Sequence, residues 1–291
     1  MEIRVMNRKL YLGVVVLFFA GLTSCASLLQ TSLNAGAQSG VSEGAQVSTS
    51  TQAPKSLLWV GNSFFYYNNS MHGHVGQLLK AGGEKGYSST SVTISGSGLN
   101  WHDVESNFKP GGVGSYSFVG DNEVKFNGAD KSFDAVMMMD CSQCPIHPQL
   151  STVFYSYVAK HSNTVRAHGA RPILFMSWAY ADKPEMTEPL AQAYIKAGQL
   201  NQAQVVPAGY AFKNALARRP DLKLIIADKR HPTLMGTYLA ACTVLASVYS
   251  INPIGNPYTA GLPKEDALYL QQVAWQTVTD FKESRLAKYQ N

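Results

Sequence analysis

The sequence predicts an α/β protein, a three-layer α/β/α sandwich around a mostly parallel, flavodoxin-like sheet of about five strands. Two observations lead to this fold class. Short apolar runs alternate with longer stretches of helical periodicity from Ser56 onward, which is typical of parallel βαβ units with helices on both faces. The chain has 291 residues, of which 45% are hydrophobic and 15% charged, so it can bury a sizeable core.

Five runs predict the strands, because each is short and apolar and ends at polar or turn residues. They cover residues 57–60, 91–94, 135–139, 172–177 and 222–227. Longer segments with apolar residues three and four positions apart predict the helices. These cover residues 71–79, 150–167, 190–204, 210–218, 234–249 and 264–288.

The N-terminus predicts a lipoprotein signal peptide at residues 1–24. Three basic residues precede an apolar run at residues 10–22, and this run is shorter than the roughly 20 residues that a membrane span needs. The sequence Leu-Thr-Ser-Cys then resembles the bacterial lipobox, in which the signal is removed before the cysteine, here Cys25, and that cysteine carries the lipid. An ordinary secretion signal with an incidental Cys25 is the alternative.

The lipobox resemblance also implies a location. Ala26 stands where a signal for inner-membrane retention would show Asp, so we expect a bacterial cell-envelope protein, lipid-anchored to the outer membrane and facing the periplasm or the surface. Residues 25–54 are rich in Ser, Thr, Gln, Ala and Gly, a composition that predicts a disordered tether. Residues 55–291 then form the folded domain.

The charge of the chain argues against nucleic acid as a partner. Removing residues 1–24 takes away three basic residues and one acidic residue, so the formal charge of +5 falls to +3. The remaining sequence has no Lys/Arg block and no alternation of basic and aromatic residues. We therefore expect a mildly basic protein that does not bind nucleic acid.

Cysteine and histidine residues raise the question of a redox or metal site. Cys141 and Cys144 form a C-x-x-C pair, which can close a disulfide in an oxidising compartment or act as redox or zinc-binding thiols. No second pair accompanies it, and His72 and His74 stand two apart in a predicted helix, where their side chains diverge. We therefore expect no metal and no cofactor, and a buried free thiol at Cys242.

Polar residues follow four of the predicted strands. In parallel sheets the carboxyl ends of the strands share one edge, and ligands bind there. The segments concerned are Ser63, residues 95–103, residues 140–145 and residues 228–232. We expect them to meet at one rim.

Three residues of these segments suit nucleophilic catalysis. A serine hydroxyl needs a base to take its proton, and the base needs a partner that fixes its tautomer. Ser63 follows the first strand, and Asp228 and His231 follow the last, so the three predict a triad in the order Ser, Asp, His. The structural alternatives are a turn or cap role for Ser63, and a helix start at His231 that Asp228 caps.

The residues around this triad resemble a known family. "WVGNSF" near the start of the domain and "DKRHPTLMGTYLAA" near its end are similar to motifs of the SGNH/GDSL hydrolase superfamily, in its bacterial secreted branch. The resemblance spans roughly residues 57–255. It implies that Ser63 is the nucleophile, His231 the general base and Asp228 the carboxylate that orients the base.

The resemblance also implies three oxyanion donors. They are the backbone N–H of Ser63, the N–H of a glycine after the second strand, best matched by Gly96 with Gly98 as its neighbour, and an amide side chain after the third strand. The usual G-x-N-D of the third block is absent, and "MMMDCSQCP" stands in its place. Gln143 falls where the Asn would be, and another register puts Met139 there, which cannot donate.

The function expected from this resemblance is a cell-envelope serine esterase. It would hydrolyse small ester groups, with O-acetyl groups on carbohydrate favoured, and its substrate would be a small-molecule or glycan ester. A lipase or lysophospholipase is the second enzyme alternative. A non-catalytic surface binding lipoprotein on a hydrolase scaffold is the third, because the third block is altered.

Overall fold

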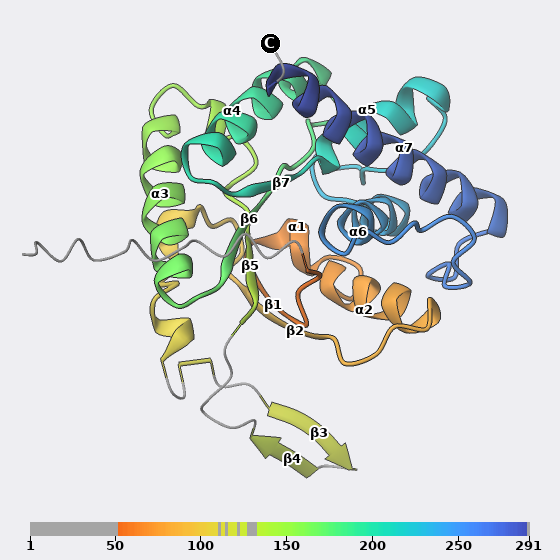
Figure 1. Cartoon of the computed structure of the whole chain (residues 1–291). Helices are drawn as coiled ribbons and strands as arrows, with labels where there is room; N and C mark the ends of the chain where they lie inside the picture. The colour runs from red at the N-terminus through yellow and green to blue at the C-terminus, as the bar shows by residue number, and fades with distance from the viewer. Residues whose placement is uncertain (1–51, 110–111, 114–115, 121–122, 127–132, 290–291) are drawn as a thin grey trace, which may run out of the picture. The chain divides into compact units, whose positions relative to one another are not determined.

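The structure, a computed structural model, describes residues 52–109, 112–113, 116–120, 123–126 and 133–289. Its centre is a five-stranded sheet in which every neighbouring pair of strands is parallel (Figure 1). The strands in spatial order are β2 (Ser88–Thr93), β1 (Ser56–Gly61), β5 (Ala135–Met138), β6 (Arg171–Phe175) and β7 (Gln204–Val206). The predicted fold class is therefore confirmed.

Helices cover both faces of this sheet, which completes the three layers. α3 and α4 pack together on one face, and α2 packs with α6 on the other, where α5 and α7 also contact α6 (Figure 1). The helices are α1 (Ser63–Tyr66), α2 (Met71–Ala81), α3 (Ser151–Ala167), α4 (Thr187–Leu200), α5 (Ala208–Arg218), α6 (Leu234–Val248) and α7 (Lys264–Tyr289). Short 3-10 turns are η1 (Leu99–Trp101), η2 (Ser106–Phe108), η3 (Cys144–Ile146) and η4 (Pro184–Met186).

The connection between β2 and β5 contains a hairpin that the sequence did not predict. Its strands, β3 (Tyr116–Gly120) and β4 (Glu123–Phe126), pair antiparallel and form a separate two-stranded sheet. Each has four or five residues, and no long apolar run marks either of them in the sequence.

The fifth strand was predicted in the wrong place. The strand at the sheet edge is β7, Gln204–Val206, which has three residues. It begins at the last residue of a helix predicted over 190–204 and was missed, because so short a run carries no readable period. Residues 222–227 join no sheet: they make one isolated antiparallel bridge, between Ile225 and Pro232, and end in a turn at Ala227. Leu222 and Leu224 are buried and Lys223 between them is exposed. The alternation that predicted a strand therefore comes from packing of this segment outside the sheet.

The N-terminal predictions fall outside the described residues. The signal peptide at residues 1–24, the lipid site at Cys25 and the tether up to residue 51 all precede the first described residue, Gln52. They remain predictions. In the part of the chain that the structure does describe, no helix combines the length and the apolar character needed to cross a bilayer.

The extended segment at residues 222–226 packs closely on the first turn of α6. A β-carbon placed at Gly236 would lie 2.2 Å from the carbonyl oxygen of Leu224, which is backbone and cannot rotate away. Gly236 therefore permits the contact between α6 and the segment that leads into the predicted site loop at residues 228–232. In α2, by contrast, a β-carbon at Gly76 would meet nothing within 4 Å.

This contrast predicts opposite effects of the same substitution. Gly236→Ala should lower the free energy of unfolding by about 1–3 kcal/mol, because α6 must move away from Leu224. Gly76→Ala, the matched control, should raise it by about 0.5–1 kcal/mol, because alanine favours a helix interior. Urea unfolding of both variants measures the two changes, and an unchanged or stabilised Gly236→Ala would contradict the close packing.

Candidate active site

The end of β1 places Ser63 at the rim. Asn62 follows the strand with extended backbone and caps α1, because its side-chain oxygen accepts a hydrogen bond from the N–H of Phe64 at 3.2 Å. Ser63 is the first residue of the helix and is 7% exposed. Its backbone N–H lies in the first turn, where a helix offers no internal acceptor.

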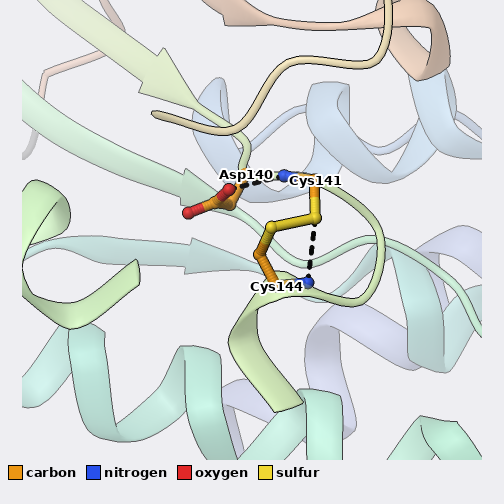
Figure 2. Close-up of side chains that lie close together, drawn as sticks. All are labelled: Asp140, Cys141 and Cys144. Carbon is orange, nitrogen blue, oxygen red and sulfur yellow. Dashed lines mark hydrogen bonds between the residues drawn. A yellow bond between two sulfur atoms is a disulfide. The ribbon is translucent and has the colours of Figure 1, made fainter. Parts of the chain in front are cut away.

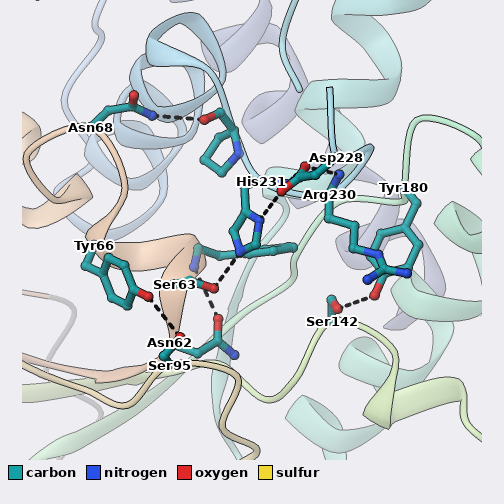
Figure 3. Close-up of polar contacts among 12 residues, drawn as sticks. Asn62, Ser63, Tyr66, Asn68, Ser95, Ser142, Tyr180, Asp228, Arg230 and His231 are labelled. Atoms are coloured by element: carbon teal, nitrogen blue, oxygen red, sulfur yellow. Dashed lines mark hydrogen bonds and ion pairs between the residues drawn. The ribbon is translucent and has the colours of Figure 1, made fainter. Parts of the chain in front are cut away.

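Ser63, His231 and Asp228 meet in one hydrogen-bonded row (Figure 3). The Ser63 Oγ lies 2.8 Å from His231 Nε2, and His231 Nδ1 lies 2.5 Å from Asp228 Oδ2. A carboxylate can only accept, so it selects the imidazole tautomer that carries its proton on Nδ1. His231 Nε2 is then free to accept the proton of the Ser63 hydroxyl. The structure thus brings together the three residues that the sequence singled out.

The loop that carries Asp228 and His231 is a tight turn of its own. Asp228 Oδ1 accepts hydrogen bonds from the N–H groups of Arg230 at 2.9 Å and His231 at 3.0 Å, and Lys229 has a φ of +70°. Burial acts to raise the pKa of the Asp228 carboxyl, but hydrogen bonds from His231 and Arg230 outweigh it and hold the pKa below its ordinary value. The carboxylate therefore stays ionised to stabilise an imidazolium.

The alternative in which Asp228 caps the following helix is wrong. α6 begins at Leu234, and its cap is Thr233, whose hydroxyl accepts a hydrogen bond from the N–H of Gly236 at 3.3 Å. The hydrogen bonds of Asp228 go instead to the N–H groups of its own turn and to the imidazole of His231.

Aromatic rings in α1 and directly after it hold the imidazole of His231 in place. The Tyr67 ring stacks on it with centroids 4.3 Å apart and planes 8° apart, and Phe64 meets it edge-on at 5.5 Å. Phe64 in turn stacks on Trp178 at 4.7 Å. Neither Phe64 nor Tyr67 was predicted to have this role, although both lie within four residues after Ser63, which was the available signal.

A buried polar cluster, made of Asn62, Ser97, Leu99 and Asp140, ties three rim loops together. The side-chain amide of Asn62 donates to the carbonyls of Ser97 at 2.9 Å and Asp140 at 3.2 Å. The N–H of Leu99 donates to Asp140 Oδ1 at 3.2 Å. The residues that follow β1, β2 and β5 are thereby fixed to one another.

Solved structures share this arrangement of strands and helices. A DUF4886 family protein from Bacteroides uniformis matches with a TM-score of 0.56 and 20% identity over 77% of this chain and 94% of its own. A candidate SGNH hydrolase from Slackia heliotrinireducens matches with a TM-score of 0.50 and 21% identity over 66% and 97% of the two chains. A candidate GDSL-like lipase from Parabacteroides merdae has a TM-score of 0.50 and 11% identity over 68% and 96%.

The chain has the fold of the SGNH hydrolases. The resemblance inferred from its first and last motifs is confirmed at this level. No protein-family model and no curated protein matches the sequence. At 11–21% identity the likeness establishes the fold, so the chemistry must be argued from the site itself.

Two of the three expected oxyanion donors are backbone groups at the rim of this SGNH fold. Ser63 offers its first-turn N–H, and Gly96 has a φ of +71°, a conformation that suits glycine in the loop after β2. The third, Gln143, directs its amide at the sulfur of Met186, 3.9 Å away. Gln143 must leave this weak contact before it can donate to an oxyanion. Met139, the other register, is buried.

Two histidines in or next to the rim loops, His74 and His102, make hydrogen bonds within the scaffold. His74 is bonded to the hydroxyl of Tyr258 at 2.8 Å and to the carbonyl of Asn68 at 2.7 Å. His102 contacts the hydroxyl of Ser97 at 2.9 Å, and burial lowers its pKa to about 4. His102 is therefore neutral at pH 7, and both side chains belong to the scaffold.

Cys141 and Cys144 form a disulfide, which settles the pairing that the sequence left open. Among the described residues, Asp140, Cys141 and Cys144 are the one group whose ligand atoms lie close enough to hold a metal ion. Both sulfurs are engaged in the bond, as Figure 2 shows, so neither is a thiolate ligand in this state. Cys242 is a buried free cysteine, as predicted from its apolar helix.

Asp140 gives the polar cluster a measurable pH dependence. Burial raises the pKa of its carboxyl to about 6, against the opposing hydrogen bonds from the N–H groups of Cys141 and Leu99. The folded protein thus holds this proton more tightly than the unfolded chain does. The contribution of Asp140 to stability is therefore largest below about pH 4 and is lost as the pH rises through about 6.

We expect the substitution Asp140→Asn to remove this dependence. The free energy of unfolding of the wild type, minus that of the variant, should fall by about 2–3 kcal/mol between about pH 4 and pH 7. Urea unfolding at several pH values measures this difference. His102 titrates over the same range with the opposite sign, but it is present in both proteins and cancels. A difference that stays flat or rises with pH would show that Asp140 is not buried as described.

Proposed function

We propose that this protein is a serine esterase that hydrolyses small ester groups, with O-acetyl groups on carbohydrate as the favoured substrate. The observation that carries the proposal is the row from Ser63 through His231 to Asp228, with distances of 2.8 and 2.5 Å. A nucleophile, a base and an oriented carboxylate at hydrogen-bond distance are what acyl transfer by serine requires. The chemistry needs no cofactor.

The proposed reaction proceeds through an acyl-enzyme. His231 Nε2 takes the proton of the Ser63 hydroxyl as Oγ attacks the ester carbonyl, and the backbone N–H groups of Ser63 and Gly96 stabilise the oxyanion. His231 then gives the proton to the leaving alcohol, activates a water molecule and lets the acid depart. Gln143 serves as the third donor once its amide turns away from Met186.

The preference for acylated carbohydrate is supported by aromatic side chains at the rim. Trp101, in the turn after β2, is 60% exposed, and Tyr66 and Tyr67 stack on each other in the turn that follows Ser63. Flat rings of this kind bind the apolar faces of sugars. The lipobox resemblance at Cys25 supports a place in the cell envelope, where such glycans occur.

Two other functions each have one observation in their favour. Exposed Ile94 and Trp101 both follow β2 and would suit a longer acyl chain, as in a lipase or lysophospholipase. The contact of Gln143 with Met186 favours a binding lipoprotein whose oxyanion site is incomplete. Turnover of esters of graded acyl length separates all three.

We predict serine-dependent release of nitrophenol that is fastest from the acetyl ester and falls for butyryl and longer esters. Ser63→Ala should abolish it, because among the described residues no other nucleophile is hydrogen-bonded to His231 Nε2. Ser95→Ala is the matched control, since this exposed rim serine contacts Tyr66 and not the imidazole, and it should retain turnover. A maximum at long chains would establish the lipase. Absence of serine-dependent turnover on every ester would establish the binding protein.

A second prediction concerns the tautomer of His231. In Asp228→Asn the side-chain oxygen can still accept the N–H groups of Arg230 and His231, but an amide nitrogen now faces Nδ1. This favours the tautomer with its proton on Nε2, which cannot accept from Ser63. We expect kcat to fall by about 10³–10⁴ with the fold intact by circular dichroism. Asp221→Asn, on the exposed Asp that lies near Arg219, is the control. A loss below about tenfold would exclude Asp228 from the triad.

A further inference from the structure

The Cys141–Cys144 disulfide can contribute little to the stability of the whole fold. The two cysteines are three positions apart in the sequence, so the bond closes a very small loop. The stabilisation that a disulfide gives through the unfolded chain grows with the length of the loop that it closes. The principal effect of this bond is therefore local, on Ser142 and Gln143 inside the ring.

The two sulfurs differ in access. Cys141 is half-buried, whereas Cys144 is 8% exposed. The N–H of Cys144 donates to Cys141 Sγ at 3.0 Å, as Figure 2 shows. A hydrogen bond of this kind stabilises a thiolate once one forms on Cys141. Cys141 is the better target for an incoming thiol because it is the more exposed of the two, and the hydrogen bond favours its release as a thiolate in the last step.

A buried carboxyl that the esterase chemistry does not use lies beside both sulfurs. Asp140 is 3% exposed, and one of its oxygens lies within 4.8 Å of both sulfurs (Figure 2). Its raised pKa, about 6, means that the carboxyl can carry a proton near neutral pH. At this separation Asp140 can give that proton, by way of one water molecule, to a thiolate that leaves from Cys144.

We propose that Cys141 and Cys144 form a second reactive site, which exchanges with a dithiol reductant and which, when reduced, slows ester hydrolysis at Ser63. The part about ester hydrolysis rests on the proposed function, and the exchange does not. One thiolate of the dithiol attacks Cys141 Sγ and forms a mixed disulfide. The electron pair of the Cys141–Cys144 bond goes to Cys144 Sγ, which takes a proton from Asp140. The second thiol of the reductant then attacks its own mixed disulfide and releases Cys141.

The net change balances: the dithiol is oxidised to a disulfide, and the protein disulfide is reduced to two thiols. Of the two protons that the thiols of the reductant lose, one replaces the proton that Asp140 gave and the other protonates the released Cys141 thiolate.

Two hydrogen bonds and the position of Gln143 couple the reactive pair to the esterase site. Ser142 Oγ and the Tyr180 hydroxyl are hydrogen-bonded at 2.6 Å on the triad side of the loop (Figure 3). Gln143, inside the ring, is the expected third oxyanion donor. The carbonyl of Asp140 accepts a hydrogen bond from the side-chain amide of Asn62, the residue directly before Ser63. Opening the ring frees the loop that carries Ser142 and Gln143, so the rim loses part of its fixed geometry.

The first experiment labels the thiols of the full-length protein without denaturant. The oxidised protein is incubated with dithiothreitol, quenched with iodoacetamide and mapped by peptide mass spectrometry. We expect both Cys141 and Cys144 to become alkylated while Cys242, which is fully buried, stays unlabelled and so reports that the fold remains closed. If the pair is labelled only together with Cys242, the disulfide is an inert structural bond and the proposal is wrong.

The second experiment measures turnover of the acetyl ester by the same samples. Reduction should lower kcat by about fivefold or more, a loss that displaced positioning groups readily cause, and reoxidation with the cyclic disulfide of dithiothreitol should restore it. The double variant Cys141→Ser, Cys144→Ser should have the low rate and no response to reductant. Equal rates before and after reduction would overturn the coupling. Absence of Ser63-dependent turnover in the oxidised protein would instead overturn the esterase proposal, while the labelling result would still stand.

The role of Asp140 is tested by Asp140→Asn, in which the amide oxygen can still accept the two N–H groups. We expect labelling of Cys141 and Cys144 to slow by about tenfold or more, because the leaving thiolate loses its proton donor, with Cys242 still protected. Unchanged labelling would remove Asp140 from the exchange.

Discussion

The Asn62 side chain is the constraint on which the rim of this protein depends. Its oxygen caps α1 and so positions Ser63, and its amide holds the carbonyls of Ser97 and Asp140. A parallel sheet aligns the carboxyl ends of β1, β2 and β5 but leaves the loops beyond them unpaired. At 4% exposed, Asn62 works in a medium where an unmet hydrogen bond costs about 1–3 kcal/mol, so all three loops are held in one arrangement.

The opposite side of the site is positioned without any strand. The loop that bears Asp228 and His231 follows an extended segment that Gly236 allows to lie against α6. Trp178 Nε1 then donates to the carbonyl of Arg230 at 2.9 Å, and Asn68 donates to the carbonyl of Pro232 at 3.0 Å, on either side of His231. These contacts, with the Tyr67 ring, give the imidazole a single orientation. The position of the nucleophile Ser63 is thus determined by the sheet, and the position of the base His231 by packing and hydrogen bonds outside the sheet.

The sequence predicted what depends on long patterns and missed what depends on single contacts. All six predicted helices exist, because each repeats its apolar spacing over several turns. Ser63 was found because it follows a strand, whereas Asp228 and His231 were found from their spacing and their motif, although no strand of the sheet leads into their loop. The three-residue strand β7 was missed, and residues 222–227 were mistaken for it, since burial beside α6 produces the same alternation as burial in a sheet. The role of Asn62 was missed although it directly precedes Ser63. Its hydrogen bonds reach residues 35 and 78 positions away, which no local sequence pattern reveals.

The third block, in which Cys141–Cys144 stand in place of the usual G-x-N-D, can still serve an oxyanion site if what the site needs there is a rigid loop and not one particular residue. A loop that aims donors at a developing charge must not relax when the charge appears. A buried hydrogen-bond cluster supplies that stiffness after β1 and β2 and, after β5, as far as Asp140. Beyond Asp140 the covalent ring from Cys141 to Cys144 supplies it. Buried hydrogen bonds persist as long as the fold does, whereas a half-buried disulfide persists only while its surroundings are oxidising. A rim fixed in this way is complete only in an oxidising environment, such as the envelope that the lipobox resemblance predicts.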